Sequence, residues 1–67
     1  MTYRIEFNPT EDHFRTMQRM GTAKKRRDYP LVVERGLRSP EEAERFIKDM
    51  GTSPGWSRDS YRIIRES

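Results

Sequence analysis

The chain has 67 residues, of which 31% are hydrophobic and 37% are charged, and its formal net charge is +3. This length supports one small domain and leaves little room for a catalytic cleft. The absence of cysteine excludes a disulfide framework, thiol catalysis and cysteine-ligated zinc, and it favours a cytoplasmic protein. We therefore expect a single compact domain over residues 1–67 that is not an enzyme.

The N-terminus has no apolar stretch of the signal-peptide type. No apolar run approaches the roughly 20 residues of a membrane-spanning helix. Because the chain starts with Met1 and fits one domain, we expect a complete small gene product that does not associate with membranes.

Residues 2–7 predict the first strand. Tyr3, Ile5 and Phe7 alternate with two charged residues, which is the pattern of a half-buried strand with one face on the core.

Residues 9–20 predict a helix from weaker signals. Asn8 is expected to cap it, with a proline at the first helical position and Gly21 as the terminator. Apolar residues recur at every third position from Phe14 to Met20, which makes a narrow stripe. An irregular excursion between two strands is the alternative, but a loop of about 20 residues without structure is unusual in a small domain.

The segment 22–28 has no apolar periodicity and predicts a basic, solvated loop, a type of segment that is often mobile. The apolar run 31–33 predicts a second strand that ends near Arg35. We expect a turn or bulge at Gly36, and we expect Leu37 to tuck under the start of the next helix.

Residues 40–50 carry the strongest helix signal. Ser39 is expected as the N-cap, in a capping box in which its hydroxyl and the Glu42 carboxylate each accept the other residue's backbone N–H. Pro40 suits the first helical position, and Gly51 is expected as a left-handed cap. The apolar stripe of this helix consists of Ala43, Phe46, Ile47 and Met50.

Residues 52–59 predict a loop with a Pro-Gly turn at 54–55, and residues 60–66 predict the last strand. Tyr61 and Ile63 are expected on one face of this strand, and the next residue on the other.

These elements predict a small α+β fold of order β-(α)-β-α-β, in which the helix 40–50 packs on a three-stranded sheet. The first two strands are expected to be antiparallel, and the later β-α-β unit right-handed if its strands are parallel. The predicted core is Tyr3, Ile5, Phe7, Leu31, Val33, Ala43, Phe46, Ile47, Met50, Tyr61 and Ile63, with Phe14 and Met17 if the first helix forms.

The excess positive charge is concentrated in residues 22–38, which hold six cations against two acids. Adjacent cations can neutralise phosphates and release their counterions, and a nearby aromatic ring can stack on a base. The predicted binding residues for nucleic acid or an acidic partner are Lys24, Lys25, Arg26, Arg27, Tyr29, Arg35 and Arg38. The alternative is a solvated loop that only aids solubility.

Trp56 and Arg58 form a second candidate, as anchors of a protein interface. In the alternative, Trp56 covers an open edge of the small core.

His13 is the only histidine, so it cannot form a recognisable zinc site, and with Asp12 and a distant serine it predicts no catalytic triad. We expect His13 to be an ordinary surface residue. The methionines expected to fill gaps in the core are Met17, Met20 and Met50.

A strand ending near Arg35, the helix S-P-E-E-A-E-R-F-I and the late Y-R-I-I are similar to patterns in many small open reading frames of bacteria and phages. No residue set identifies a named family. We expect a non-catalytic module that binds nucleic acid or a nucleoprotein complex through its basic segment, without a cofactor, metal or small-molecule substrate, as a monomer or weak dimer. The alternative is a phage-type inhibitor or accessory protein that docks on an acidic surface of a larger host enzyme.

Overall fold

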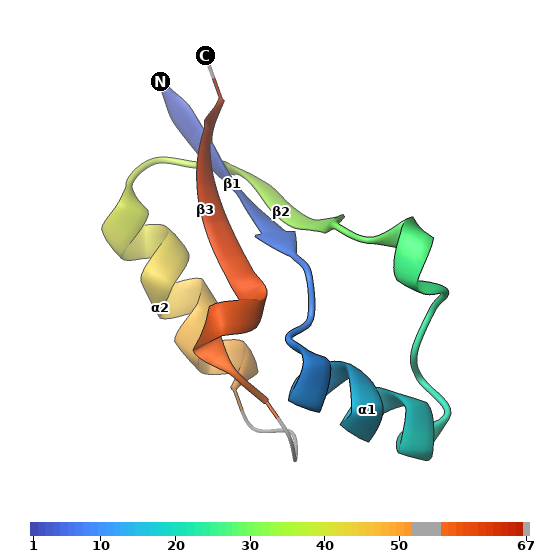
Figure 1. Ribbon diagram of the computed structural model, residues 1–67. Coiled ribbons are helices and arrows are strands. Elements are labelled where there is room, and N and C mark those ends of the chain that lie inside the picture. Colours follow the sequence, from blue (N-terminus) through green and yellow to red (C-terminus); the bar gives the residue numbers. More distant parts are fainter. Residues whose placement is uncertain (52–55, 67) are drawn as a thin grey trace.

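A computed structural model describes residues 1–51 and 56–66. The elements are β1 (Thr2–Phe7), α1 (Glu11–Met20), a 3₁₀ turn (Arg26–Asp28), β2 (Leu31–Leu37), α2 (Pro40–Met50), a second 3₁₀ turn (Arg58–Ser60) and β3 (Tyr61–Glu66). The predicted α+β class and the order β-α-β-α-β are confirmed, and the first helix exists (Figure 1). The Pro-Gly turn predicted at 54–55 lies outside the described residues.

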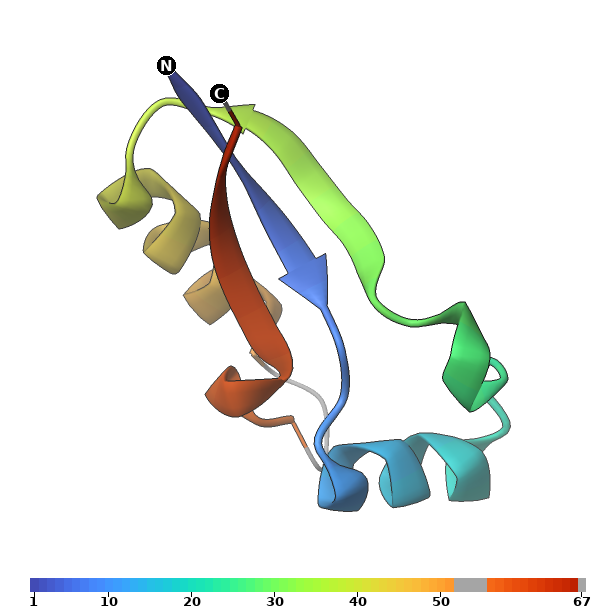
Figure 2. The ribbon, with the colours of Figure 1, turned by 45° about the horizontal axis from the view of Figure 1, so that its top comes forward.

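The first strand of the chain is the centre of the sheet. The strand order is β2-β1-β3, and both pairings are antiparallel, so the expected antiparallel pairing of the first two strands is confirmed. Since both outer strands run opposite to β1, they are parallel to each other. α2 makes the connection between them and lies along one face of the sheet (Figure 2).

The core lies between this face and α2. Tyr3, Ile5 and Phe7 alternate along β1; the first two belong to the cluster beneath α2, and Phe7 is also buried, at 9% exposure. The buried cluster is Ile5, Leu37, Ala43 and Ile47, with Tyr3, Phe46, Met50, Trp56, Tyr61 and Ile63 packed against it. None of the helices in the described residues is long and apolar enough to cross a membrane.

β2 contradicts the prediction that Val33 is a core residue, because this side chain is 37% exposed. Ile5 pairs with Glu34, whereas the next residue of β1 pairs with Val32. One extra residue of β2 is therefore accommodated at Val33, as in a β-bulge, and the alternation of faces is interrupted there.

A second irregularity follows between Glu34 and Leu37, which pairs with Tyr3. Gly36 lies within it and has a φ of 73°, a conformation that glycine adopts without a steric penalty. The strand thus continues two residues beyond its predicted end at Arg35, and it places Leu37 in the core beneath α2, as expected.

α2 has the predicted bounds, but its two ends differ from the prediction in detail. Ser39 Oγ accepts the backbone N–H of Glu42 at 3.1 Å, while the Glu42 carboxylate accepts the N–H of Arg38 at 3.1 Å and not that of Ser39. Gly51 has a φ of −80°, so the left-handed cap is wrong. Glycine is favoured there for another reason: a Cβ at Gly51 would lie 3.0 Å from Cε2 of Trp56.

α1 begins two residues later than predicted. Asn8 is not the cap, because the helix begins only at Glu11, and the backbone N–H of Asn8 donates to the carbonyl of Ser60 at 2.7 Å. Thr10 caps the helix instead, and its Oγ1 accepts the N–H of His13 at 3.3 Å. Gly21 ends the helix in the left-handed region with a φ of 75°, as a terminating glycine should. Met20 is 56% exposed, so its expected place in the core is wrong.

Candidate nucleic-acid interface

The excess positive charge of the molecule lies on one projecting unit, the basic arm, which we define as residues 11–28. It consists of α1 and the segment that follows as far as the end of the first 3₁₀ turn, and it lies beyond the end of β1 (Figures 1 and 2). The arm holds three acids and six cations, namely Arg15, Arg19, Lys24, Lys25, Arg26 and Arg27. Its net charge of +3 equals that of the whole chain, so the remaining residues are neutral in sum.

A buried polar pair joins the arm to the sheet. His13 is 6% exposed and its Nδ1 lies 2.8 Å from Oγ of Ser60, which is 2% exposed at the start of β3. The backbone N–H of Thr10 donates to the same Oγ at 3.0 Å. The ring of Phe7 packs edge-on against the imidazole at 5.2 Å. The expectation that His13 is an ordinary surface residue is therefore wrong, and no local pattern reveals its burial.

We call the hydrogen-bonded pair of His13 and Ser60 the latch, because it joins the arm to the sheet. Because Ser60 Oγ already accepts the N–H of Thr10, its own hydrogen can be donated to Nδ1 of a neutral imidazole. Burial lowers the pKa of His13, which favours this neutral form. A serine and a histidine in hydrogen-bond contact are also the first two members of a nucleophile–base arrangement, but only 2% of Ser60 is exposed.

An aromatic cluster holds the other end of the arm. Tyr29 makes edge-to-face contacts with Phe7, at a centroid distance of 5.7 Å, and with Phe14, at 6.1 Å. Its hydroxyl accepts the backbone N–H of Lys24 at 3.1 Å. Such aromatic pairs contribute about 0.5–1.5 kcal/mol each beyond their buried area. The sequence suggested Tyr29 as a stacking surface for a base. In the structure it is half-buried, and its contacts with Phe7 and Phe14 hold the arm in place.

Arg26 links the basic segment to α1. Its guanidinium donates to the carbonyl of Pro9 at 2.9 Å, lies 3.7 Å from the Glu11 carboxylate and stands 4.7 Å above the ring of Phe14. Cation–π contacts of this kind contribute about 0.5–1 kcal/mol at exposed sites. The side chain stays 49% exposed, so it supports the arm and still meets solvent.

Lys24, Lys25 and Arg27 are exposed, and their side chains form no ion pair or hydrogen bond with any described residue. The predicted loop is partly ordered, because residues 26–28 form a 3₁₀ turn. Three cations are thus presented to solvent on a segment that is fixed at both ends.

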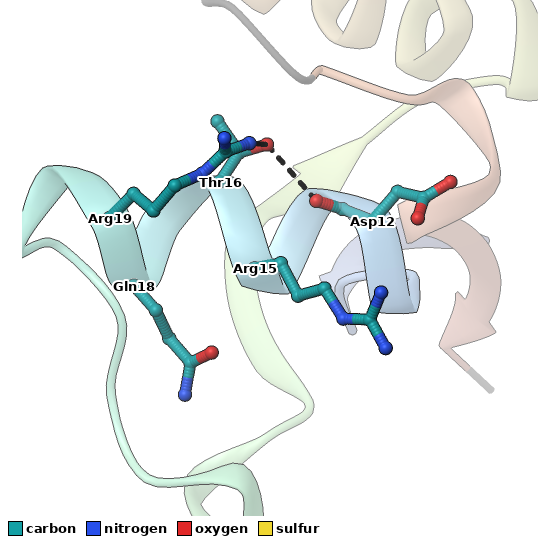
Figure 3. Close-up of a pocket in the computed structure, with 5 residues that line it drawn as sticks. All are labelled: Asp12, Arg15, Thr16, Gln18 and Arg19. Atoms are coloured by element: carbon teal, nitrogen blue, oxygen red, sulfur yellow. Dashed lines mark hydrogen bonds between the residues drawn. The ribbon is translucent and has the colours of Figure 1, made fainter.

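Two surfaces of the arm are lined mostly by polar and charged side chains. On the outer side of α1, Arg19 donates to Thr16 Oγ1, which in turn donates to the carbonyl of Asp12 (Figure 3). The residues lining this surface, Asp12, Arg15, Thr16, Gln18 and Arg19, all come from one helix, so it is an open helix face; Gln18 lies at its margin and also lines the hollow described next. On the inner side, α1 and residues 21–26 line a shallow hollow of about 650 Å³ that is broadly open to solvent.

Arg35 and Arg38 are not brought to the arm. They lie at the far end of β2 and after it, whereas the arm joins the beginning of that strand (Figure 1). Arg35 lies 3.6 Å from the carboxylate of Glu66 on β3. The seven binding residues predicted from the sequence therefore divide into two groups: the arm holds the first four and Tyr29 follows it directly, whereas Arg35 and Arg38 lie elsewhere. Sequence reasoning missed Arg15 and Arg19 as members, since only the fold sets α1 beside the basic segment.

Trp56 and Arg58 make contacts within the molecule. Trp56 is half-buried, packs against the core and lies 6.0 Å from the ring of Tyr61. Arg58 Nε donates to both carboxylate oxygens of Glu44 at 3.0 and 3.1 Å, and Nη1 donates to the carbonyl of Tyr61 at 2.8 Å. The hydrogen bonds from Arg58 to the Glu44 carboxylate lower the pKa of Glu44. The packing of Trp56 is what the covering role requires, and its role as an interface anchor stays a prediction.

Comparisons of the chain with protein-family models, with curated proteins and with solved structures find no match. Within residues 1–51 and 56–66, no three side chains of the metal-ligating types come together. Function is therefore inferred from the arm itself.

Proposed function

We propose that the protein is a non-catalytic binding module that engages nucleic acid, alone or in a nucleoprotein complex, through the basic arm. The observation that supports this most directly is the separation of charge. The whole net charge of +3 resides on residues 11–28, while the sheet and α2 carry equal numbers of cations and acids. A charged arm on a neutral scaffold suits a polyanion, because each phosphate contact releases condensed counterions.

The arm is also held in shape before it binds. The latch between His13 and Ser60 secures the start of α1, and the contacts of Tyr29 and Arg26 secure the basic segment. Since less conformational freedom is lost on binding, a preordered set of cations binds more tightly than the same cations on a disordered loop.

The exposed cations of the arm carry the phosphate contacts in this proposal. These are Lys24, Lys25 and Arg27 on the basic segment, with Arg15 and Arg19 on α1. Arg26 belongs to the interface as well, but its removal would also disturb the arm. Arg35 and Arg38 lie away from the arm and contribute little.

The triple variant Lys24→Ser, Lys25→Ser, Arg27→Ser tests the proposal. Binding to a labelled oligonucleotide should weaken at least about tenfold, and the slope of log K against log salt should shrink by about 0.9 for each lost phosphate contact. The melting temperature should change little, because these exposed side chains form no hydrogen bond or ion pair with described residues. Fluorescence anisotropy over a salt series measures the first two quantities, and circular dichroism the third.

The matched control is Arg38→Ser, Arg45→Ser, Arg65→Ser, which removes the same charge from exposed positions outside the arm. It should bind nearly as well as the wild type. Equal losses in both triple variants would contradict the proposal, because binding would then depend on net charge and not on the arm.

Docking on an acidic surface of a larger host enzyme, the alternative raised by the sequence, would use the same charges. The intramolecular packing of Trp56 gives that alternative no added support. A pull-down from lysate with and without nuclease separates the two. A single protein partner that survives nuclease favours the alternative, and loss of all partners favours nucleic acid.

A further inference from the structure

The hollow on the inner side of the arm differs from a plain phosphate-binding surface. It is open and has a volume of about 650 Å³. Its lining includes an aromatic ring, an amide and three cations, and no carboxylate: Phe14, Gln18, Gly21, Ala23, Lys24, Lys25 and Arg26. A hollow of this composition complements a ligand that is flat and apolar in one part and anionic in another.

One wall of the hollow is a preassembled stack. The Arg26 guanidinium lies over the Phe14 ring at 4.7 Å and is fixed there by the Pro9 carbonyl and the Glu11 carboxylate. About half of the Arg26 side chain remains exposed. Exposed guanidinium planes and aromatic rings are the surfaces on which proteins stack unpaired bases.

The remaining wall supplies polar groups at complementary positions. The Gln18 side chain leaves α1 on the side opposite Thr16 (Figure 3) and lines the hollow. Its amide has both a donor and an acceptor, so it can pair with the edge of a base. Lys24 and Lys25 are exposed and line the same hollow, where their ammonium groups can meet the phosphates on either side of that base.

We infer, on the basis of the proposed nucleic-acid binding, that this hollow takes one unpaired base of a single-stranded nucleic acid. The base stacks on the Arg26 guanidinium, and its edge meets Gln18. In a duplex both faces of a base are covered by its neighbours, so a paired base cannot enter the hollow without being unstacked. The arm therefore prefers single strands, whether DNA or RNA, over duplexes of equal charge.

The wild-type protein allows a test by choice of probe alone. Anisotropy titrations at one salt concentration would compare single-stranded DNA, single-stranded RNA, a hairpin duplex and a single strand of abasic sites, each of about 12 nucleotides. The intact single strands should bind about tenfold more tightly than the abasic strand, which has the same phosphates but no bases. The DNA and RNA probes together show whether the 2′-hydroxyl matters.

Two variants and one control test whether the base lies in the hollow. Ala23→Phe fills it and should lower single-strand affinity about tenfold while the salt slope stays at the wild-type value. Met20→Phe adds a ring at an exposed position outside the hollow and should bind as the wild type does. Gln18→Leu keeps the size of the side chain but removes its hydrogen bonds, and it should weaken binding to intact strands but not to the abasic strand.

The outcomes separate this inference from the proposed function. Equal affinity for the intact, abasic and duplex probes would overturn the inference and leave the phosphate-binding arm standing. Failure to bind any probe would overturn both. Should Ala23→Phe not fold, as judged by circular dichroism, the abasic comparison with the wild-type protein decides the question.

Discussion

At the scale of single residues, His13 is the most informative position. It is the only histidine, and the fold buries it against Phe7 with its Nδ1 on Ser60. Burial penalises the charged imidazolium and lowers the pKa of His13, whereas the unfolded chain protonates near the ordinary value of about 6.5. The latch that holds the arm is thus sensitive to acid.

The sign of this linkage gives a prediction. Between the lowered folded-state pKa and about 6.5 the unfolded state binds more protons, so stability is complete above that window and is lost as the pH falls through it. Urea unfolding of the wild type from about pH 8 to about pH 5 should show this decline. His13→Gln should be less stable at neutral pH but should have a flatter profile.

A parallel decline in His13→Gln would contradict the assignment to His13. The Glu44 carboxylate contributes in a separate window, because hydrogen bonds from Arg58 lower its pKa. Its share of stability is present above about pH 4.3 and is lost below it in both proteins.

At the scale of elements, α1 and α2 differ in how they are held. α2 packs along the sheet and shares the core with β1, β2 and β3. The arm is held by the latch and by the aromatic contacts of Phe7, Phe14 and Tyr29 at its ends. Elements with few buried apolar contacts open at lower free energy than the core does.

Tyr29→Ala should therefore loosen the arm without unfolding the sheet. It removes the ring between Phe7 and Phe14 and the acceptor of the Lys24 N–H, contacts that together amount to about 1.5–4.5 kcal/mol. Hydrogen exchange should accelerate in residues 11–28 and stay near the wild-type rate in α2 and β1. A uniform acceleration would show that the arm and the core open together. Tyr3→Ala, at the other end of β1, provides the matched comparison for loss of a tyrosine.

At the scale of the whole molecule, one small core supports everything else. The fully buried side chains in that core, Ile5, Ala43 and Ile47, come from β1 and α2. Domains of this size have only a few kcal/mol of net stability, so each of these residues matters to the arm as well. The residues outside the arm have no net charge, so the net charge of the molecule lies on the arm.

Ile47→Ala should destabilise the whole molecule by about 2–5 kcal/mol, because it removes buried methylene groups and leaves a cavity. Chemical denaturation followed by circular dichroism measures this change. Lys48→Ala, at the next and exposed position, should shift the stability by less than about 0.5 kcal/mol. Similar effects of the two substitutions would contradict the observed packing of α2.

Local signals in the sequence determined β1, α2 and the order of the elements. The alternation in residues 2–7 and the cap, proline and apolar stripe of residues 40–50 are patterns of neighbouring residues. They therefore favour a strand and a helix without contacts from distant parts of the chain. The concentration of cations before Asp28 is also plain in the sequence. These signals were sufficient for the α+β class and for part of the candidate interface.

Only the tertiary structure decided the rest, because it depends on contacts between distant residues. Two irregularities in the pairing of β2 with β1 interrupt the alternation of faces and leave Val33 37% exposed, and no alternation pattern encodes them. The burial of His13 depends on Ser60, 47 residues away. Arg15 and Arg19 belong to the same arm as Lys24–Arg27 because contacts with Ser60 and Tyr29 fix the position of α1. That position also creates the hollow between α1 and the basic segment.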